Sequence, residues 1–147
     1  MALDLQAEYI RFGLVWDVWL KNMYRVNEEA NVKSVNVMMT INGLCLFSIT
    51  QFMDEMLKLK KKFGYQAAVM SFNILRFPSF QSIVTLPEPI RLERAAAMEA
   101  WLEKNWNGGK NGFIDIERDG LLRLIEYTKS VQKGHEFTSS LDSRLRD

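Results

Sequence analysis

The stretch "VNVMMTINGLCLFSITQ", Val35 to Gln51, contains two patterns that together decide the fold. Its first eight residues alternate in polarity, and a period of two predicts a β-strand. One set is Val35, Val37, Met39 and Ile41, and the other is Asn36, Met38, Thr40 and Asn42. Ser48 then precedes Gln51 by three residues, the spacing of a capping box, with Phe47 and Phe52 placed as a hydrophobic staple. The stretch therefore predicts a strand that leads into a helix from Ser48.

The residues after this stretch predict the rest of a βαβ unit. The helix ends in a lysine-rich turn, which suits the negative end of its dipole, and Gly64 offers a stop. A second strand is predicted from Ala67 to Phe77, and Pro78 ends it because proline has no N–H to donate. Two strands separated by a helix of about fourteen residues are expected to be parallel.

Helices are predicted on both sides of this unit. An amphipathic pattern runs from Gln6 to Asn27, and Gly13 inside it favours a helix start just after that glycine. The apolar connection after Phe77 is expected to pack on the molecule. Pro87 and Pro89 indicate a helix to about Lys104, and Asp115 is expected to cap a last helix to about Val131.

Composition restricts the class of protein. The 147 residues, 48% apolar and 25% charged, predict one globular α/β domain. The net charge of +1 comes from interspersed charges, so no nucleic-acid surface is expected. The chain shows neither an apolar run long enough for a membrane span nor a signal-peptide pattern, so a cytoplasmic location is expected.

A sheet of two parallel strands is rarely stable by itself. Independent stability usually needs at least three strands, or extensive packing of helices on the sheet. The chain is therefore expected either to pack on copies of itself or to belong to a larger α/β sheet or barrel. In such folds the working residues follow the carboxyl ends of the strands. Here these residues are Thr40, Asn42 and Gly43 after the first strand, and Asn73, Arg76, Ser79 and Gln81 after the second.

These amides, hydroxyls and one arginine suit ligand binding better than proton abstraction. The asparagines could equally satisfy turn backbone, and Arg76 could pair with a surface carboxylate. Other candidates are weaker. Cys45 lies among apolar neighbours as an inert thiol would, and His135 lies in a polar tail. The lysines of residues 58–62 are expected at a solvated helix end, and "GGKNG" at residues 108–112 lacks the spacing of a phosphate loop.

Three blocks in succession resemble the later part of a radical S-adenosylmethionine protein of the twitch-domain kind. They are "AEYIRFGLVWDVWLKNMYRV", "VNVMMTINGLCLFSITQFMDEMLKLKKKFG" and "MSFNILRFPSFQSIVTLP", and the resemblance runs from about Leu3 to Leu102. It implies a fragment of a (β/α)6 partial TIM-type barrel over residues 1–105: the end of strand four with its helix, strand five with its helix, and strand six. Residues 106–147 would add a C-terminal helix and a polar tail.

The resemblance also implies a site for S-adenosylmethionine. Asp4 would contact the ribose, although Ala2 stands where the family often has serine, and Arg11 would hold the methionyl carboxylate through a bidentate guanidinium. Thr40 to Asn42 would line the cofactor near the end of strand five. Asn73 to Phe77, which includes Arg76, would pack on the adenine.

The departure from the family is the absence of its C-x3-C-x2-C loop, because Cys45 is the only cysteine. A 4Fe-4S cluster would have to come from an upstream segment or a partner. The expected function is thus part of a radical S-adenosylmethionine enzyme, with the missing barrel half or self-association as the partner and an unknown substrate. The alternatives are a non-enzymatic α/β interaction module and a small ligand-binding α/β domain.

Overall fold

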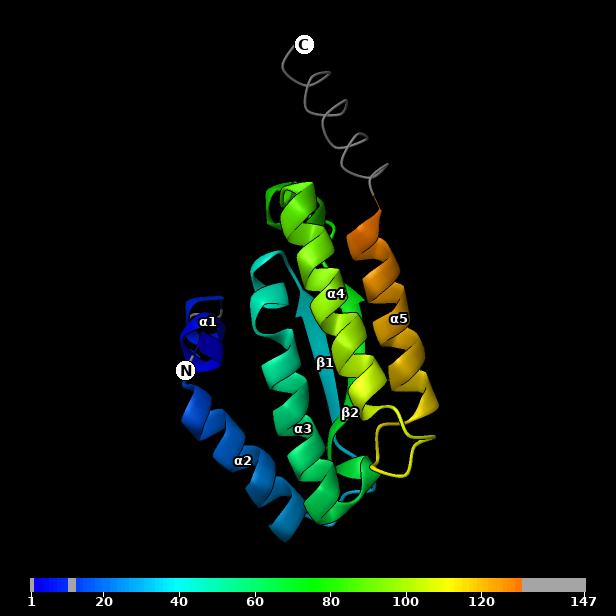
Figure 1. Cartoon of the computed structure of the whole chain (residues 1–147). Helices are drawn as coiled ribbons and strands as arrows, with labels where there is room; N and C mark the ends of the chain where they lie inside the picture. The colour runs from blue at the N-terminus through cyan, green and yellow to red at the C-terminus, as the bar shows by residue number, and fades with distance from the viewer. Residues whose placement is uncertain (1, 11–12, 131–147) are drawn as a thin grey trace.

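The structure is a computed structural model, and it describes residues 2–10 and 13–130 (Figure 1). The helices and strands are α1 (Ala2–Ile10), α2 (Trp16–Glu29), β1 (Asn36–Ile41), α3 (Ile49–Phe63), β2 (Val69–Ile74), α4 (Glu88–Asn105) and α5 (Asp115–Lys129). Four short 3₁₀ turns join them: η1 (Leu44–Phe47), η2 (Tyr65–Ala68), η3 (Ser79–Gln81) and η4 (Ile83–Thr85). The described residues thus form a mixed α/β fold with two parallel strands and five α-helices, as the sequence predicts at that level.

The two strands pair in parallel over six residues each. Val37 lies opposite Met70, and Thr40 lies opposite Asn73. Both strands are shorter than predicted, because residues 65–68 form a 3₁₀ turn before β2 and the strand ends at Ile74. The pairing continues slightly further through the backbone, where the N–H of Leu75 donates to the carbonyl of Ile41 at 3.0 Å.

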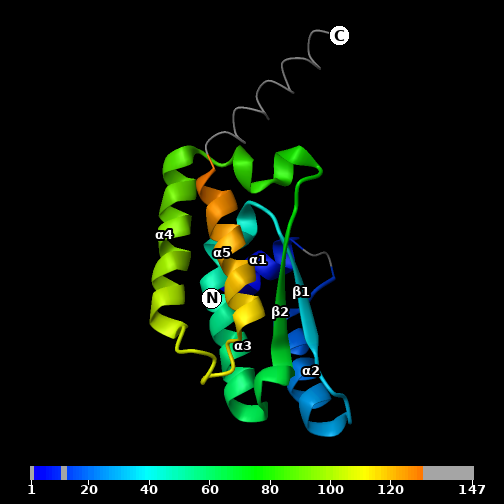
Figure 2. The ribbon, with the colours of Figure 1, turned by 90° about the vertical axis from the view of Figure 1, so that its right-hand side faces the viewer.

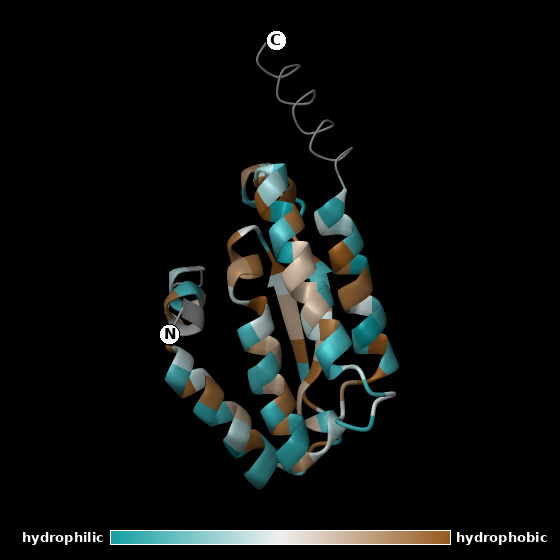
Figure 3. Cartoon of the chain, in the orientation of Figure 1, coloured by the Kyte–Doolittle hydropathy of each residue, from teal (hydrophilic) through white to brown (hydrophobic). Residues whose placement is uncertain are grey.

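Helices cover one face of this sheet, and the core lies between them. The side chains directed to this face are Val37, Met39 and Ile41 of β1 and Met70, Phe72 and Ile74 of β2, all of which belong to the apolar core. Helices α3 and α5 lie on this side, and α4 packs outside them against α5 (Figure 2). Burying each large apolar side chain here contributes roughly 1.5–3 kcal/mol. Figure 3 shows hydrophobic and hydrophilic residues alternating along α3, as expected of a helix with one buried face.

Glycines set two of the helix boundaries that the sequence predicts. Gly13 has a φ of 85° and lies just before the second helix, which begins at Trp16. The residues before this break form a separate helix, α1. Gly64 follows α3 with a φ of 101°, a backbone conformation that side chains with a Cβ rarely adopt.

The caps of α3 and α5 differ from the prediction. Helix α3 does begin directly after Ser48, but the Ser48 side chain makes no capping hydrogen bond. A 3₁₀ turn precedes this serine, and its φ of −127° and ψ of 3° differ from the extended conformation of an ordinary N-cap. Helix α5 begins at Asp115, with Ile114 at the cap position instead. The Glu117 carboxylate accepts a hydrogen bond from the Ile114 N–H at 3.1 Å.

The connection between β2 and α4 packs on the molecule, as predicted from its apolar residues. Ile83 is fully buried, and Ser82 is nearly so. The connection also reaches the end of β1, where the Gly43 N–H donates to the Gln81 carbonyl at 2.9 Å. The loops that follow the two strands are therefore joined above the carboxyl end of the sheet.

The lysine-rich end of α3 is not uniformly solvated, and the prediction for this segment is wrong at Lys60. Its side chain is fully buried and lies 2.8 Å from the carboxylate of Glu117 on α5, which is also fully buried. Lys60 follows Met53 and Met56 at helical spacing, so it lies on the apolar stripe of the helix. Burial lowers the pKa of Lys60 below its ordinary value of 10.5, against the opposing effect of Glu117.

Arg91 is a second buried cation, and it connects the first turns of α4 to the end of α5. Its Nε donates to the Leu86 carbonyl at 3.1 Å. Its Nη1 donates to the carbonyls of Thr128 and Ser130, at 3.2 and 2.9 Å, at the end of α5. A guanidinium at this position satisfies carbonyls that the last helical turn leaves unpaired, and it complements the helix dipole. Among the described helices, none is long and apolar enough to cross a membrane.

Candidate functional site

Among residues 2–10 and 13–130, no helix covers the second face of the sheet, which bears mostly polar side chains (Figure 2). Its exposed residues are Asn36, Met38 and Thr40 of β1 and Ser71 and Asn73 of β2. Parallel sheets are usually covered on both faces. This uncovered surface, called here the open face, is therefore the feature of the fold that most needs an explanation. The assignment of the alternating residues to two faces confirms the strand pattern read from the sequence.

The carboxyl end of the open face brings two predicted site residues together. Thr40 and Asn73 are direct partners in the strand register, and both side chains are exposed. In an α/β sheet this end of the strands is where ligands bind. A hydroxyl and an amide at this position offer both donors and acceptors to a polar ligand.

Asn42 follows β1 and has a structural role. Its side-chain oxygen accepts a hydrogen bond from the Cys45 N–H at 3.0 Å, and so supports the turn into η1. This arrangement corresponds to the turn-forming alternative considered for the asparagines. The amide nitrogen of Asn42 has no hydrogen bond among the described residues.

Arg76 follows β2 near the same end of the sheet. Its guanidinium carbon lies 5.7 Å from the centre of the Tyr127 ring of α5, within the range of a cation–π contact. The residue is exposed. The structure thus places an aromatic ring, and no carboxylate among the described residues, beside this cation.

The other two predicted residues come from the N-terminal segment. Asp4 lies in α1, so the prediction that this position ends a strand is wrong for the described chain. Arg11 lies outside the described residues. Helix α1 contacts η1, which follows β1, so the N-terminal segment does lie near the carboxyl end of the sheet.

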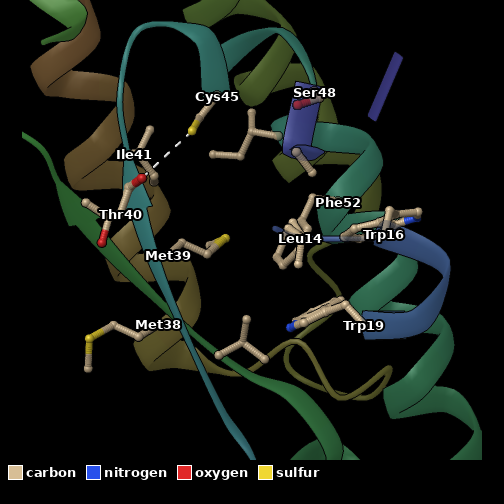
Figure 4. Close-up of a pocket in the computed structure, with 13 residues that line it drawn as sticks. Leu14, Trp16, Trp19, Met38, Met39, Thr40, Ile41, Cys45, Ser48 and Phe52 are labelled. Carbon is tan, nitrogen blue, oxygen red and sulfur yellow. Dashed lines mark hydrogen bonds between the residues drawn. The ribbon is translucent and has the colours of Figure 1, made fainter. Parts of the chain in front are cut away.

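A cavity of about 300 Å³ runs along the outer edge of β1 (Figure 4). Residues 37–41 line it consecutively, which shows that the backbone edge of the strand forms one wall. The opposite wall includes Trp16 and Trp19 of α2 and Phe52 of α3. The two indoles stack with centres 5.2 Å apart, and each lies 5.9 Å from the Phe52 ring. We call this cavity the edge slot.

Phe52 packs against Trp16 and Trp19, and the three rings form the wall of the slot that faces β1. Cys45 also lines the slot, and its Sγ donates weakly to the Thr40 carbonyl at 3.8 Å. The thiol is partly buried among apolar groups, a setting that does not favour the reactive thiolate. Sequence reasoning did not find the slot, because its walls come from α1, α2, β1 and α3.

The "GGKNG" segment forms a loop that its own side chains organise. Asn111 donates to the Asn105 carbonyl at 2.8 Å, and its side-chain oxygen accepts the Phe113 N–H at 3.1 Å. Gly108, Gly109 and Gly112 all have positive φ, which explains the glycines without a bound phosphate.

The part of the chain that the structure describes contains no group of three or more side chains suited to hold a metal ion. Comparisons with models of protein families, with curated protein sequences and with solved structures find no match for this chain.

Proposed function

We propose that the chain supplies the lateral part of an S-adenosylmethionine pocket in a radical S-adenosylmethionine enzyme. The rest of the barrel and the cluster would come from an upstream segment or a partner. The observation that carries the proposal is the exposure of Thr40 and Asn73 side by side at the carboxyl ends of parallel strands. This exposure supports the proposal, because ligands of α/β sheets bind at the carboxyl ends of the strands.

The uncovered state of the open face also supports the proposal. In a closed or partial barrel this face would be turned to the interior, and its polar side chains would surround a ligand. The opposite face already packs on α3 and α5, as the outer face of a barrel strand does. In such a barrel the polar face would line a ligand site, because barrel interiors are otherwise filled by apolar side chains.

The polar groups suit an adenosine. A threonine hydroxyl and an asparagine amide can bond ribose hydroxyls and the donor and acceptor edge of a base. Arg76 lies over Tyr127 of α5, on the helix-covered side of the sheet, so it would have to leave this ring to reach a ligand on the open face. Arg11, outside the described residues, remains the proposed partner of the methionyl carboxylate. The ribose contact expected of Asp4 is not proposed again, because it assumed a strand end and Asp4 lies in α1.

The iron-sulfur cluster does not fit this chain. Three thiolates are needed, and the sequence contains only Cys45. That thiol lies in η1 beside the Thr40 carbonyl and the apolar edge slot. The chain's own residues are therefore proposed to bind and orient S-adenosylmethionine, and no radical step is assigned to them.

Two asparagines on the open face allow a matched test. Asn73 lies at the carboxyl end of β2 and Asn36 at the amino end of β1, and both are exposed. S-adenosylmethionine is titrated into the full chain and its Asn73→Leu and Asn36→Leu variants by calorimetry, at millimolar ligand because half a pocket binds weakly. We expect Asn73→Leu to weaken binding about threefold to tenfold, the effect of one lost hydrogen bond, and Asn36→Leu to leave it unchanged. Equal affinities for all three proteins, or no binding, would refute the proposal.

A second candidate is the interaction module. Large apolar side chains are exposed on the open face and in the connection after β2: Met38 is 73% exposed, and Phe77 and Phe80 are 78% and 71% exposed. Clustered apolar exposure of this kind marks protein interfaces. Sedimentation of the chain alone distinguishes self-association, which favours this candidate, from a monomer, which leaves the open face to a ligand or to the rest of a barrel.

A further inference from the structure

The backbone of β1 presents unpaired hydrogen-bonding groups to the edge slot. Val35 both donates to the Gln66 carbonyl and accepts from the Val69 N–H, and the Ile41 carbonyl accepts from Leu75. Odd-numbered residues of β1 thus direct their backbone groups toward β2. The even-numbered residues, Met38 and Thr40, direct theirs to the opposite edge because the strand alternates.

Within the described residues, the N–H groups of Met38 and Thr40 have no hydrogen-bond partner. The Thr40 carbonyl receives only a weak contact from the Cys45 thiol at 3.8 Å. Edge groups of this kind are a template for another strand. Natural proteins usually protect such an edge with charge, proline or a bulge, and β1 contains none of these along residues 36–41.

The slot lies along the free backbone edge of β1, where a further strand would pair. Neighbouring strands lie about 4.8 Å apart, and α2 stands beyond the edge as a wall formed by Trp16 and Trp19 (Figure 4). Leu14 and Phe52 complete this wall with apolar surface. Residues 37–41 give the slot a length of roughly 13 Å at the usual strand rise, enough for about five residues.

We propose that the edge slot binds an extended β-strand from the part of the sheet that this chain lacks. The strand pairs with the Met38 and Thr40 backbone, and its apolar side chains contact Trp16, Trp19 and Phe52. It runs parallel to β1, so its carboxyl end lies near α1, which contacts η1 beyond the carboxyl end of β1. The identity of this strand rests on the proposed function, whereas the pairing itself does not.

Two other occupants fit the slot less well. A second copy of the chain would have to bring its own strand, with the helices packed on it, against a cavity of about 300 Å³ that α2 bounds. A small apolar molecule would contact the aromatic wall but would leave the N–H groups of Met38 and Thr40 unpaired. An extended peptide both pairs with the backbone N–H groups of Met38 and Thr40 and places apolar side chains against the aromatic wall.

The test uses the full chain and a blocked peptide of roughly seven residues, in which valine and threonine alternate between terminal lysines. Strand addition relies on backbone bonds and so tolerates a generic sequence. Hydrogen exchange is followed by NMR at single amides. We expect saturating peptide to slow exchange at Met38 and Thr40 about tenfold or more, and to shift the indole signals of Trp16 and Trp19.

Variants separate pairing from nonspecific binding. Met38→Pro removes one edge donor that is not used by β2, and proline is tolerated on edge strands. The peptide effect is expected to disappear in this variant and to persist in Met38→Thr, the matched control that keeps the N–H. Leu14→Trp fills the slot without altering β1, and it is expected to abolish the effect even if the proline variant folds poorly.

Three results would overturn the inference. One is a peptide that leaves the Met38 and Thr40 amides unprotected. Another is equal peptide binding by Met38→Pro and Met38→Thr, which would show that only side chains bind. The third is protection that rises with protein concentration when no peptide is present, which would identify a second copy as the occupant. None of these readouts depends on S-adenosylmethionine, so this inference and the proposed function can fail separately.

Discussion

Lys60 Nζ lies 2.8 Å from Glu117 Oε1, and both side chains are fully buried. The ammonium also donates to the carbonyls of Tyr65 and Gly112, at 3.1 and 3.0 Å. The other carboxylate oxygen accepts the Met70 N–H at 2.8 Å, on the outer edge of β2. This network joins α3, the α4–α5 loop, α5 and the second strand, and it protects the edge of β2. In the described part of the chain, the edge of β1 receives a weak contact from the Cys45 thiol at the Thr40 carbonyl and no charged side chain.

The first prediction concerns the counter-charge of Lys60. Glu117→Gln keeps an oxygen for the Met70 N–H but leaves the buried ammonium uncompensated. We expect the free energy of unfolding to fall by about 3–5 kcal/mol. Urea denaturation followed by tryptophan fluorescence measures the change. Glu126→Gln, at an exposed position of the same helix, is the control and should change stability by less than about 0.5 kcal/mol. Similar losses in both variants would contradict this prediction.

The second prediction is a pH dependence from the same lysine. Burial lowers the folded-state pKa of Lys60 below 10.5, so between that lowered value and 10.5 the unfolded chain binds a proton that the folded chain does not. Stability from this group therefore rises with pH in this window. Relative to Lys60→Met, the natural chain should gain unfolding free energy as the pH rises toward 10.5. Urea denaturation across the alkaline range provides the measurement, and a constant or falling difference would argue against a lowered pKa.

The third prediction concerns Arg91, which bonds three backbone carbonyls at the top of α4 and α5. Arg91→Gln shortens the side chain and removes the charge, leaving buried carbonyls unpaired. We expect a loss of about 2–4 kcal/mol, because hydrogen bonds to charged groups are among the stronger ones. Arg123→Gln at an exposed position of α5 should have little effect. Thermal unfolding by circular dichroism tests the pair, and equal midpoints would be inconsistent with the role assigned to Arg91.

The fourth prediction is that the exposed Thr40 side chain of the open face contributes little to the stability of the fold. Thr40→Val replaces a polar, exposed strand residue by another β-branched one, so stability should change by less than about 0.5 kcal/mol. Chemical denaturation checks this result. A loss above about 1 kcal/mol would mean that the Thr40 side chain supports the fold, and its use as a ligand probe would then fail.

Local patterns in the sequence were sufficient to predict both strands and the parallel unit. The alternation correctly separated Asn36 to Ile41 into two faces, whereas Asn42 lies beyond the strand and supports the turn into η1. The glycines at positions 13 and 64 marked helix boundaries, because such effects depend on near neighbours. The apolar connection before Pro87 was also correctly expected to pack.

Features that depend on distant contacts were missed. Lys60 appeared to be part of a solvated lysine run, because Glu117 lies 57 residues away and only the folded chain brings them together. The edge slot likewise requires α2 to stand opposite β1. One local signal was available: Lys60 shares the spacing of the buried methionines of α3. The N-terminal residues were expected at a strand end but form a helix.

The most direct test of the proposed function is an NMR titration of the full chain with S-adenosylmethionine, read at assigned backbone amides. We predict saturable shifts centred on Thr40 and Asn73 at the carboxyl end of the sheet, with the amides of α4 unaffected. In the Asn73→Leu variant these shifts should need several times more ligand. Shifts that are absent from these residues, or that are unchanged in Asn73→Leu, would contradict the proposal that this end of the open face holds the ligand.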